Sequence, residues 1–233
     1  VLFIFKETST HHHKDRLSRK FFIETFGQLL SSRIFIGYTM CTFLSYGAFL
    51  AWFTISPVLL IKVVGISPID FGWIISIGGG GTMILAGLFN GTMVAKLGSH
   101  FMLRIGWTLM LLAGCLMMML KFIYGINALV VVAPMIIFYF GSTLIWPSVF
   151  ACAFAPFGKI AGYAASLYSF MQLGGGAVIS ALASYLPDNN QIPLASILIG
   201  CSTLSLGIFE FMVLSKKNLQ NDETTITTLE RKR

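Results

Sequence analysis

The sequence predicts an all-α membrane protein with six transmembrane helices. Of its 233 residues, 56% are hydrophobic and only 11% are charged, and the mean hydropathy is +0.81. Soluble domains, by contrast, carry about 25% charged residues. Long stretches without Lys, Arg, Asp or Glu recur along the chain, and the basic residues gather in segments that would lie on one side of a membrane.

Six stretches are long and apolar enough to cross a bilayer. A helix rising 1.5 Å per residue needs about 20 residues to cross about 30 Å of hydrocarbon. The uncharged gaps from Arg33 to Lys62 and from Lys121 to Lys159 exceed that length, and the shorter gap before Lys121 is extended by flanking apolar residues. The expected spans are 34–60, 70–95, 101–124, 127–152, 160–186 and 193–214.

The positions of the basic residues predict the orientation. If the N-terminus is cytoplasmic, six spans place 14 of the 16 Lys and Arg residues on the cytoplasmic side and leave only Lys62 and Lys121 outside. The positive-inside rule therefore predicts that both ends of this segment face the cytoplasm. Because topology explains the net charge of +7, no nucleic-acid partner is expected.

Polar segments flank the expected bundle of residues 34–214. Residues 1–33 read as the end of a preceding helix, since 1–5 is an apolar run too short to span, followed by a cytoplasmic linker. Residues 215–233 are polar and charged, which predicts a disordered cytoplasmic tail. His11, His12 and His13 have no carboxylate or Cys at ligand spacing, so no metal site is expected.

Glycines concentrate in the second and fifth spans. Gly87 and Gly91 form a GxxxG pair, and Gly174, Gly175 and Gly176 are consecutive. Small residues let membrane helices approach closely, so these glycines are expected at helix contacts. The alternative, a phosphate-binding loop, lacks the Lys-Ser/Thr that would follow the glycines.

Acidic residues are nearly absent from the spans. Glu210 is the one acidic residue expected inside a span, close to its cytoplasmic end. We expect it to pair with Lys216 or Lys217 rather than to carry protons. A proton-relay acid, if the protein is proton-driven, is expected outside this chain.

Aromatic and polar residues recur at helical spacing in the first and fourth spans. The first carries Tyr46 and Phe49 in a row that runs from Thr39 to Phe53, and the fourth carries Tyr139, Ser142 and Trp146. In the fifth span, Tyr168 lies one turn before Gln172. Two interpretations stay open: hydrogen bonds between helices with aromatic filling, or an apolar cavity with a few polar groups for drug-sized solutes.

The loop after the second span resembles a known signature. The segment "GTMVAKLGSHFMLR" is similar to the major facilitator loop pattern G-x-x-x-D-R-x-G-R-R-x-x-L, with Gly91, Lys96, Gly98 and Leu103 matching. Ala95 stands at the acidic position, so the match is degenerate. Residues 43–73 and 155–182 resemble the Bcr/CflA subfamily of drug-resistance transporters, and the resemblance covers nearly the whole chain.

The resemblance implies a fold and an activity. The chain would be helices 7 to 12 of a 12-helix major facilitator fold, a half built of inverted three-helix repeats. The implied activity is antiport in a bacterial inner membrane: protons enter while a hydrophobic or amphipathic antibiotic leaves. The energy source would be the proton gradient, with no cofactor, and the N-terminal six-helix half would be the partner that holds the proton-coupling acids.

The resemblance also implies roles for residues of this chain. Lys96 and Gly98, with Gly91, would hold the cytoplasmic gate loop, and Pro147 would set a kink. The expected lining residues of the substrate cavity are Tyr46, Phe49, Tyr139, Ser142, Trp146 and Gln172.

Three other functions are weighed against this one. An intramembrane enzyme would need converging catalytic groups, but the histidines all fall in expected loops and embedded carboxylates are missing. A half-size chain could work as a homodimer or be inactive. An exporter of a siderophore or metabolite with the same fold is the third.

Overall fold

The computed structural model describes residues 19–187 and 189–213, and every element in this part of the chain is helical. Six helical segments are long and apolar enough to cross a membrane. They confirm the six predicted spans, although the fourth continues further than expected, to Gly158. The six spans are Arg33–Val63, Pro68–Leu97, Ser99–Tyr124, Ala128–Gly158, Ala161–Ser184 and Ile192–Val213.

Several spans are built from more than one type of helix. The π-helical turn is wider than the α-helical one and often marks a functional site. The first span consists of α2 (Arg33–Pro57) and π-helical η2 (Val58–Val63), and the second consists of α3 (Pro68–Trp73), π-helical η3 (Ile74–Gly81) and α4 (Thr82–Leu97). The third span is α5 (Ser99–Tyr124), and the fourth consists of α6 (Ala128–Phe154) and 3₁₀-helical η4 (Ala155–Ile160). The fifth span is α7 (Ala161–Ser184), and the sixth consists of α8 (Ile192–Ile208) and π-helical η5 (Phe209–Val213).

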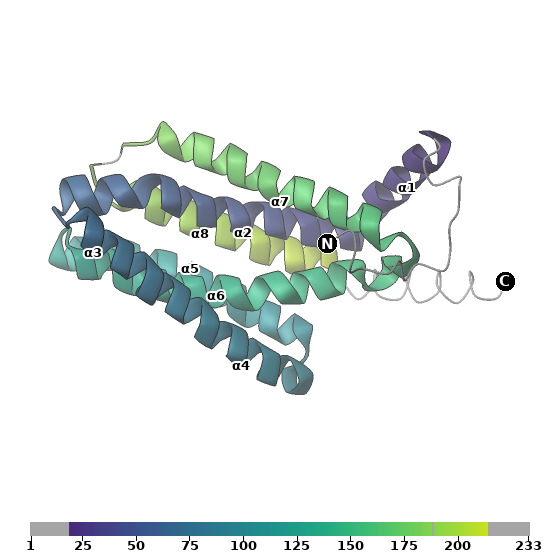
Figure 1. Cartoon of the computed structure of the whole chain (residues 1–233), viewed down its shortest axis with the longest axis horizontal. Helices are drawn as coiled ribbons and strands as arrows, with labels where there is room; N and C mark the ends of the chain where they lie inside the picture. The colour runs from purple at the N-terminus through teal and green to yellow at the C-terminus, as the bar shows by residue number, and fades with distance from the viewer. Residues whose placement is uncertain (1–18, 188, 214–233) are drawn as a thin grey trace, which may run out of the picture.

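The spans form an elongated bundle whose helices run roughly along its long axis (Figure 1). α2 packs against α7 and α8, α5 packs against α6 and α8, and α4 packs against α6. The connections α4–α5 and α6–α7 lie at the same end of the bundle as α1 (Arg19–Ser31), which we call the α1 end (Figure 1). Lys62 and Lys121 fall near the other end, in the last turns of η2 and α5.

Local sequence explains where the helices begin and end. The side chain of Ser32 accepts a hydrogen bond from Phe35 N at 3.3 Å and caps α2, and Asn127 Oδ1 accepts one from Val130 N at 3.0 Å and caps α6. Gly98, with φ of 80°, separates α4 from α5.

Helix α1 lies inside the segment that was expected to be a linker, where the sequence analysis named no helix. The expected preceding helix end and histidines fall in residues 1–18, and the expected disordered tail falls in 214–233. Both ranges lie outside the described residues.

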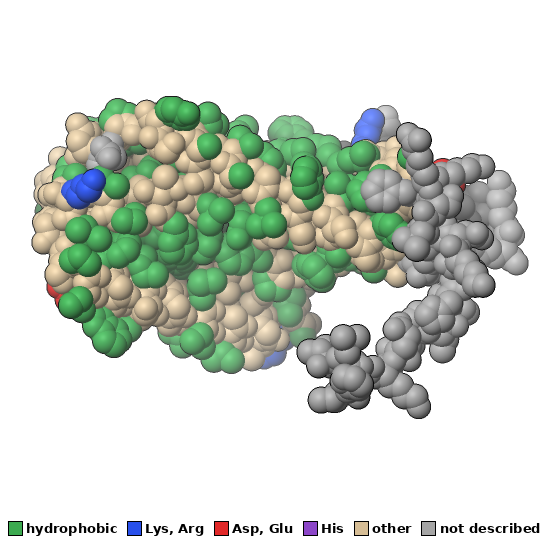
Figure 2. Space-filling view, turned by 45° about the horizontal axis from the view of Figure 1, so that its top comes forward, with side chains coloured by type: hydrophobic (Ala, Val, Ile, Leu, Met, Phe, Trp, Pro, Cys, Tyr) green, Lys and Arg blue, Asp and Glu red, His purple; other side chains and the backbone are tan. Residues whose placement is uncertain are grey.

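The surface of the bundle is largely hydrophobic. Figure 2 shows apolar side chains along the body, with charged side chains near the two ends. Burial within the chain is uneven: 56% of the most apolar window of Ala128–Gly158 is buried, against 11% for Pro68–Leu97 and 22% for Ala161–Ser184. The spans that contain α4 and α7 therefore expose most of their apolar surface. Such exposure is compatible with contact to lipid or to further membrane helices.

Two of the predicted packing glycines lie at a helix contact. A Cβ on Gly175 would lie 2.7 Å from the carbonyl carbon of Phe43, and a Cβ on Gly176 would lie 3.1 Å from the ring of Tyr46. Both contacts join α7 to α2. A side chain at either position would push these two helices apart.

Gly87 and Gly174 make no close contact with another helix among the described residues, so the packing expected of them stays a prediction. A Cβ on either residue would meet nothing within 4 Å, and the same holds for Gly91. α4 instead buries Ala86 and Asn90, which point to a different side of the helix. Isolated glycines that were not predicted make close contacts: Gly106 on Gly141, and Gly114 on α8.

Candidate functional site

An aromatic cluster forms where α2 faces α6. The ring of Phe49 lies at its centre, with centroid distances of 4.9 Å to Trp146, 5.7 Å to Tyr139, 5.9 Å to Tyr46 and 5.0 Å to Phe53. Tyr46 and Trp146 also contact each other, at 5.8 Å. Four of the six predicted lining residues are thus brought together with Phe53. We use the name aromatic cluster for these five residues: Tyr46, Phe49, Phe53, Tyr139 and Trp146.

The aromatic cluster is buried on one side and open on the other. Tyr139 is 3% exposed, Tyr46, Phe49 and Trp146 are half-buried, and Phe53 is 39% exposed. The indole Nε1 of Trp146 is buried and has no hydrogen-bond partner among the described residues. The cluster therefore offers a ring surface that an apolar solute can stack on.

The two other expected lining residues, Ser142 and Gln172, are not aromatic and take no part in the ring contacts of the aromatic cluster. Ser142 is fully buried, and its hydroxyl donates to the carbonyl oxygen of Tyr139 at 3.0 Å, so it faces the helix backbone rather than open space. Gln172 lies on α7 one turn before Gly176, which packs against Tyr46, and is partly buried. The hydrogen-bonding interpretation fits Thr42, whose hydroxyl lies 3.2 Å from the hydroxyl of Tyr168 on α7.

The residues of the expected gate loop lie at the α1 end. Gly98 has φ of 80° and ψ of 154°, a conformation that favours glycine. Lys96 and Gly91 are exposed on α4. Just after this turn, His100 Nε2 lies 3.1 Å from the hydroxyl of Tyr38, which ties the start of α5 to α2.

Glu210 pairs with Arg104, a partner that the sequence analysis did not name. Its carboxylate accepts two hydrogen bonds from Arg104 on α5, Nε to Oε1 at 2.8 Å and a terminal nitrogen to Oε2 at 3.0 Å. The expected partners Lys216 and Lys217 lie outside the described residues. Within residues 19–187 and 189–213, no group of three or more His, Cys, Asp or Glu could hold a metal ion.

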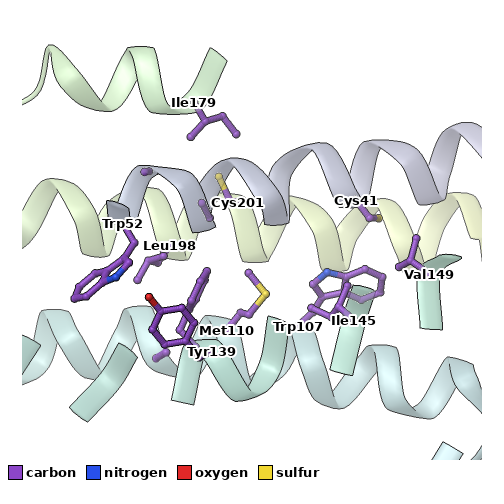
Figure 3. Close-up of a cluster of buried hydrophobic side chains, with 14 of the residues drawn as sticks. Cys41, Trp52, Trp107, Met110, Tyr139, Ile145, Val149, Ile179, Leu198 and Cys201 are labelled. Atoms are coloured by element: carbon purple, nitrogen blue, oxygen red, sulfur yellow. The ribbon is translucent and has the colours of Figure 1, made fainter. Parts of the chain in front are cut away.

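The sequence analysis missed Trp52, which is 1% exposed and lines a pocket beside the aromatic cluster. Figure 3 shows Trp52 on α2 and Tyr139 on α6, with the hydroxyl of Tyr139 directed toward the indole. Trp52 comes three residues after Phe49, so helical spacing alone could have grouped it with the aromatic row.

Comparison with known proteins decides the family. The sequence profile of the Major Facilitator Superfamily matches residues 1–180. The chain belongs to the Major Facilitator Superfamily. Proteins of this superfamily are multi-pass membrane transporters of small molecules, so the chain is a membrane protein and not an enzyme.

Three curated superfamily relatives resemble the chain at low identity. A bicyclomycin resistance protein homolog of Haemophilus influenzae is 24% identical over 221 residues, which cover 95% of this chain and 54% of the relative. An uncharacterised MFS-type transporter of Bacillus subtilis is 25% identical, covering 84% and 48%. A chloramphenicol resistance protein of Pseudomonas aeruginosa is 26% identical, covering 73% and 41%.

The chain spans about half the length of the curated relatives it matches. Its six spans agree with one half of a major facilitator fold. No solved structure matches the chain significantly.

Proposed function

We propose that this chain is the C-terminal half of a proton-coupled exporter of hydrophobic or amphipathic compounds, antibiotics among them, of the Bcr/CflA subfamily. The aromatic cluster is the observation that carries the proposal. Its rings supply an apolar surface that is open on one side, and no charged residue takes part in its ring contacts. The drug-resistance names of two relatives support the same class of solute.

The cluster suits a solute that is recognised loosely. An aromatic surface accepts many ring-bearing solutes, because every ring has a face that can stack, and each aromatic pair contributes about 0.5–1.5 kcal/mol. Such a surface fits drug-sized apolar compounds better than a multiply charged metabolite.

The N-terminal six-helix half is the proposed partner of this chain. Two observations support it: the relatives are about twice as long, and the spans containing α4 and α7 leave most of their apolar surface uncovered. In the proposed protein the two halves rock about a shared site. The proton-coupling acids would lie in the other half, since Glu210 is paired with Arg104 near one end of the bundle.

The proposed location is a bacterial inner membrane with the α1 end facing the cytoplasm. Arg33, Lys96 and Arg104 lie toward that end, whereas Lys62 and Lys121 lie toward the other. This distribution follows the positive-inside rule.

The test is efflux by the native polypeptide in everted membrane vesicles. We expect uptake of chloramphenicol that requires a proton gradient and is abolished by a protonophore. Phe49→Ala should lower the initial rate about 5- to 20-fold, because the central ring of the cluster is lost. Phe122→Ala, at a ring that is 74% exposed, should leave the rate unchanged.

Other outcomes would reject the proposal. Uptake of an iron chelator, with no uptake of chloramphenicol or other apolar antibiotics, would point to a siderophore exporter. An equal loss of rate in Phe49→Ala and Phe122→Ala would show that the aromatic cluster has no special role. Transport that persists after the proton gradient collapses would reject proton coupling.

A further inference from the structure

The short helix α1 lies outside the six spans, at the end of the bundle that carries its name. It covers Arg19–Ser31 and contacts α2 and α7. Ser32, which caps α2, separates the two helices, and Figure 1 shows α1 at an angle to α2 rather than as its continuation. α1 is therefore an element of its own, and its surroundings need a separate explanation.

One side of α1 packs on the bundle. Leu29 is fully buried and Thr25 is 4% exposed. The ring of Phe26 meets the ring of Tyr163 edge to face, with centroids 6.4 Å apart. Because Tyr163 lies in the first turn of α7, this contact holds α1 at the level where the fifth span begins.

A second side of α1 is apolar but uncovered. Ile23 is 60% exposed and Leu30 is 55% exposed. Seven residues separate them, so they lie on the same side of the helix. Phe26 lies only about 60° round the helix from Ile23. The apolar arc of α1 therefore continues past the part that the bundle covers, and we call Ile23 and Leu30 the uncovered strip.

The third side of α1 is polar. Glu24, Gln28 and Ser31 are exposed, and Gln28 lies about 140° round the helix from Ile23. A helix on the surface of a soluble domain needs one apolar side only, for the core. A helix in a lipid–water interface buries an apolar side among the lipids and turns its polar side to water. The uncovered strip is explained by the second environment.

The lengths of the spans place α1 at the depth of the lipid headgroups. The first span has 31 residues and the fifth has 24, which correspond to about 46 Å and about 36 Å at 1.5 Å per residue. The hydrocarbon core is about 30 Å thick, so both spans extend into the headgroup layer. α1 is joined to the start of the first span and contacts the start of the fifth.

We propose that α1 binds the membrane surface at the α1 end, with Ile23 and Leu30 inserted between the lipid headgroups and Gln28 in water. Residues 19–33 include three basic residues and one acidic residue, a net positive charge that favours anionic headgroups. Because α1 contacts both α2 and α7, its attachment to lipid would fix the ends of these two helices at the membrane surface. The proposal requires a membrane-spanning chain but no particular transported compound.

The test places an environment-sensitive fluorophore on two sides of α1. Ile23→Cys and Gln28→Cys are made in the native polypeptide after its other reactive cysteines, the exposed Cys115 among them, are replaced by serine. Each variant is labelled with a nitrobenzoxadiazole group and reconstituted in vesicles of phosphatidylcholine and phosphatidylglycerol. Part of the lipid carries a nitroxide quencher, either near the headgroup or near the end of the acyl chain.

We expect lipid contact at Ile23 only. Its label should emit at a shorter wavelength than the label on Gln28, and the nitroxide near the headgroup should quench it about twofold more than the deep nitroxide does. Leu30→Cys should repeat this result. Gln28→Cys is the matched control, because it lies on the same helix and is also exposed, and its label should be quenched by aqueous iodide instead. An unchanged midpoint of thermal unfolding shows that each variant keeps the fold.

Three results would overturn the proposal. Equal quenching by iodide at Ile23 and Gln28 would place the uncovered strip in water. A label on Ile23 that neither iodide nor nitroxide lipid reaches would show that protein covers the strip, either another part of the native polypeptide or a second copy. Equal quenching by lipid at both positions would show that the strip does not orient the helix. None of these results bears on export, which the uptake experiment tests separately.

Discussion

Arg104 and Glu210 form a two-point ion pair between helices that are distant in sequence. Nε of Arg104 donates to Oε1 of Glu210 at 2.8 Å, and a terminal nitrogen donates to Oε2 at 3.0 Å. The pair joins the first part of α5 to η5 at the end of the sixth span. Both side chains are about half exposed, 54% and 45%, so the pair lies at the border of the bundle rather than in its core.

The first prediction concerns reversal of this ion pair. Arg104→Glu or Glu210→Arg alone should lower the free energy of unfolding by about 0.5–1 kcal/mol, since half-exposed pairs are weak and a repulsion is added. The double reversal should restore most of the loss. Thermal unfolding in detergent measures all three variants, and a double variant no more stable than either single one would contradict a specific pairing.

The second prediction compares two adjacent glycines of α7. Gly175→Ala should destabilise the protein by about 1–3 kcal/mol, because the added methyl would overlap with the backbone of Phe43. Gly174→Ala is the control, since its methyl would meet nothing within 4 Å. The midpoint of thermal unfolding should fall only for Gly175→Ala. Equal shifts would mean that α2 and α7 are not in close contact.

The third prediction concerns the turn between α4 and α5. Gly98 has φ of 80° and ψ of 154°, which other residues adopt only at a cost of about 1–3 kcal/mol. Gly98→Ala should therefore lower stability, whereas Gly91→Ala, inside α4 with open space around it, should leave stability unchanged or slightly higher. Urea unfolding of both variants, followed by circular dichroism, would distinguish them. A stable Gly98→Ala would argue against this backbone conformation.

The spans could be predicted from the sequence because they depend on local composition. Uncharged stretches of sufficient length are visible in one dimension, and the structure confirms all six. The aromatic row of the first span was also visible, because Tyr46 and Phe49 recur at helical spacing and their rings contact each other. Helical periodicity determines which residues of one helix share a face.

Contacts between helices could not be predicted in the same way. Gly87 and Gly91 form the GxxxG pair, but a Cβ on either would meet no atom within 4 Å. Gly106 on α5 and Gly141 on α6 belong to no such motif, yet they contact each other. Which face of a helix is covered depends on its neighbours, and a single helix does not reveal them. The Arg104–Glu210 pair joins residues 106 positions apart, and nothing local indicates that partnership.

The fourth prediction is a double-mutant cycle at the contact between α5 and α2. Trp107 Nε1 donates to Ser45 Oγ at 3.1 Å, and the Ser45 hydroxyl donates to the carbonyl oxygen of Cys41 at 2.8 Å. Trp107→Phe should cost about 0.6–1.7 kcal/mol, the range for a hydrogen bond between membrane helices. Ser45→Ala should cost at least as much, because it leaves a buried indole N–H without its acceptor.

The double variant determines whether these two groups act together. Once Ser45 is alanine, replacing Trp107 by Phe removes an unpaired donor, so its further cost should be small or negative. The two single changes should therefore sum to more than the double change, with a coupling of about 0.5 kcal/mol or more. Strict additivity in thermal unfolding would show that the hydrogen bond does not contribute, and that the Trp107 ring acts through its packing on Phe209 at 4.7 Å.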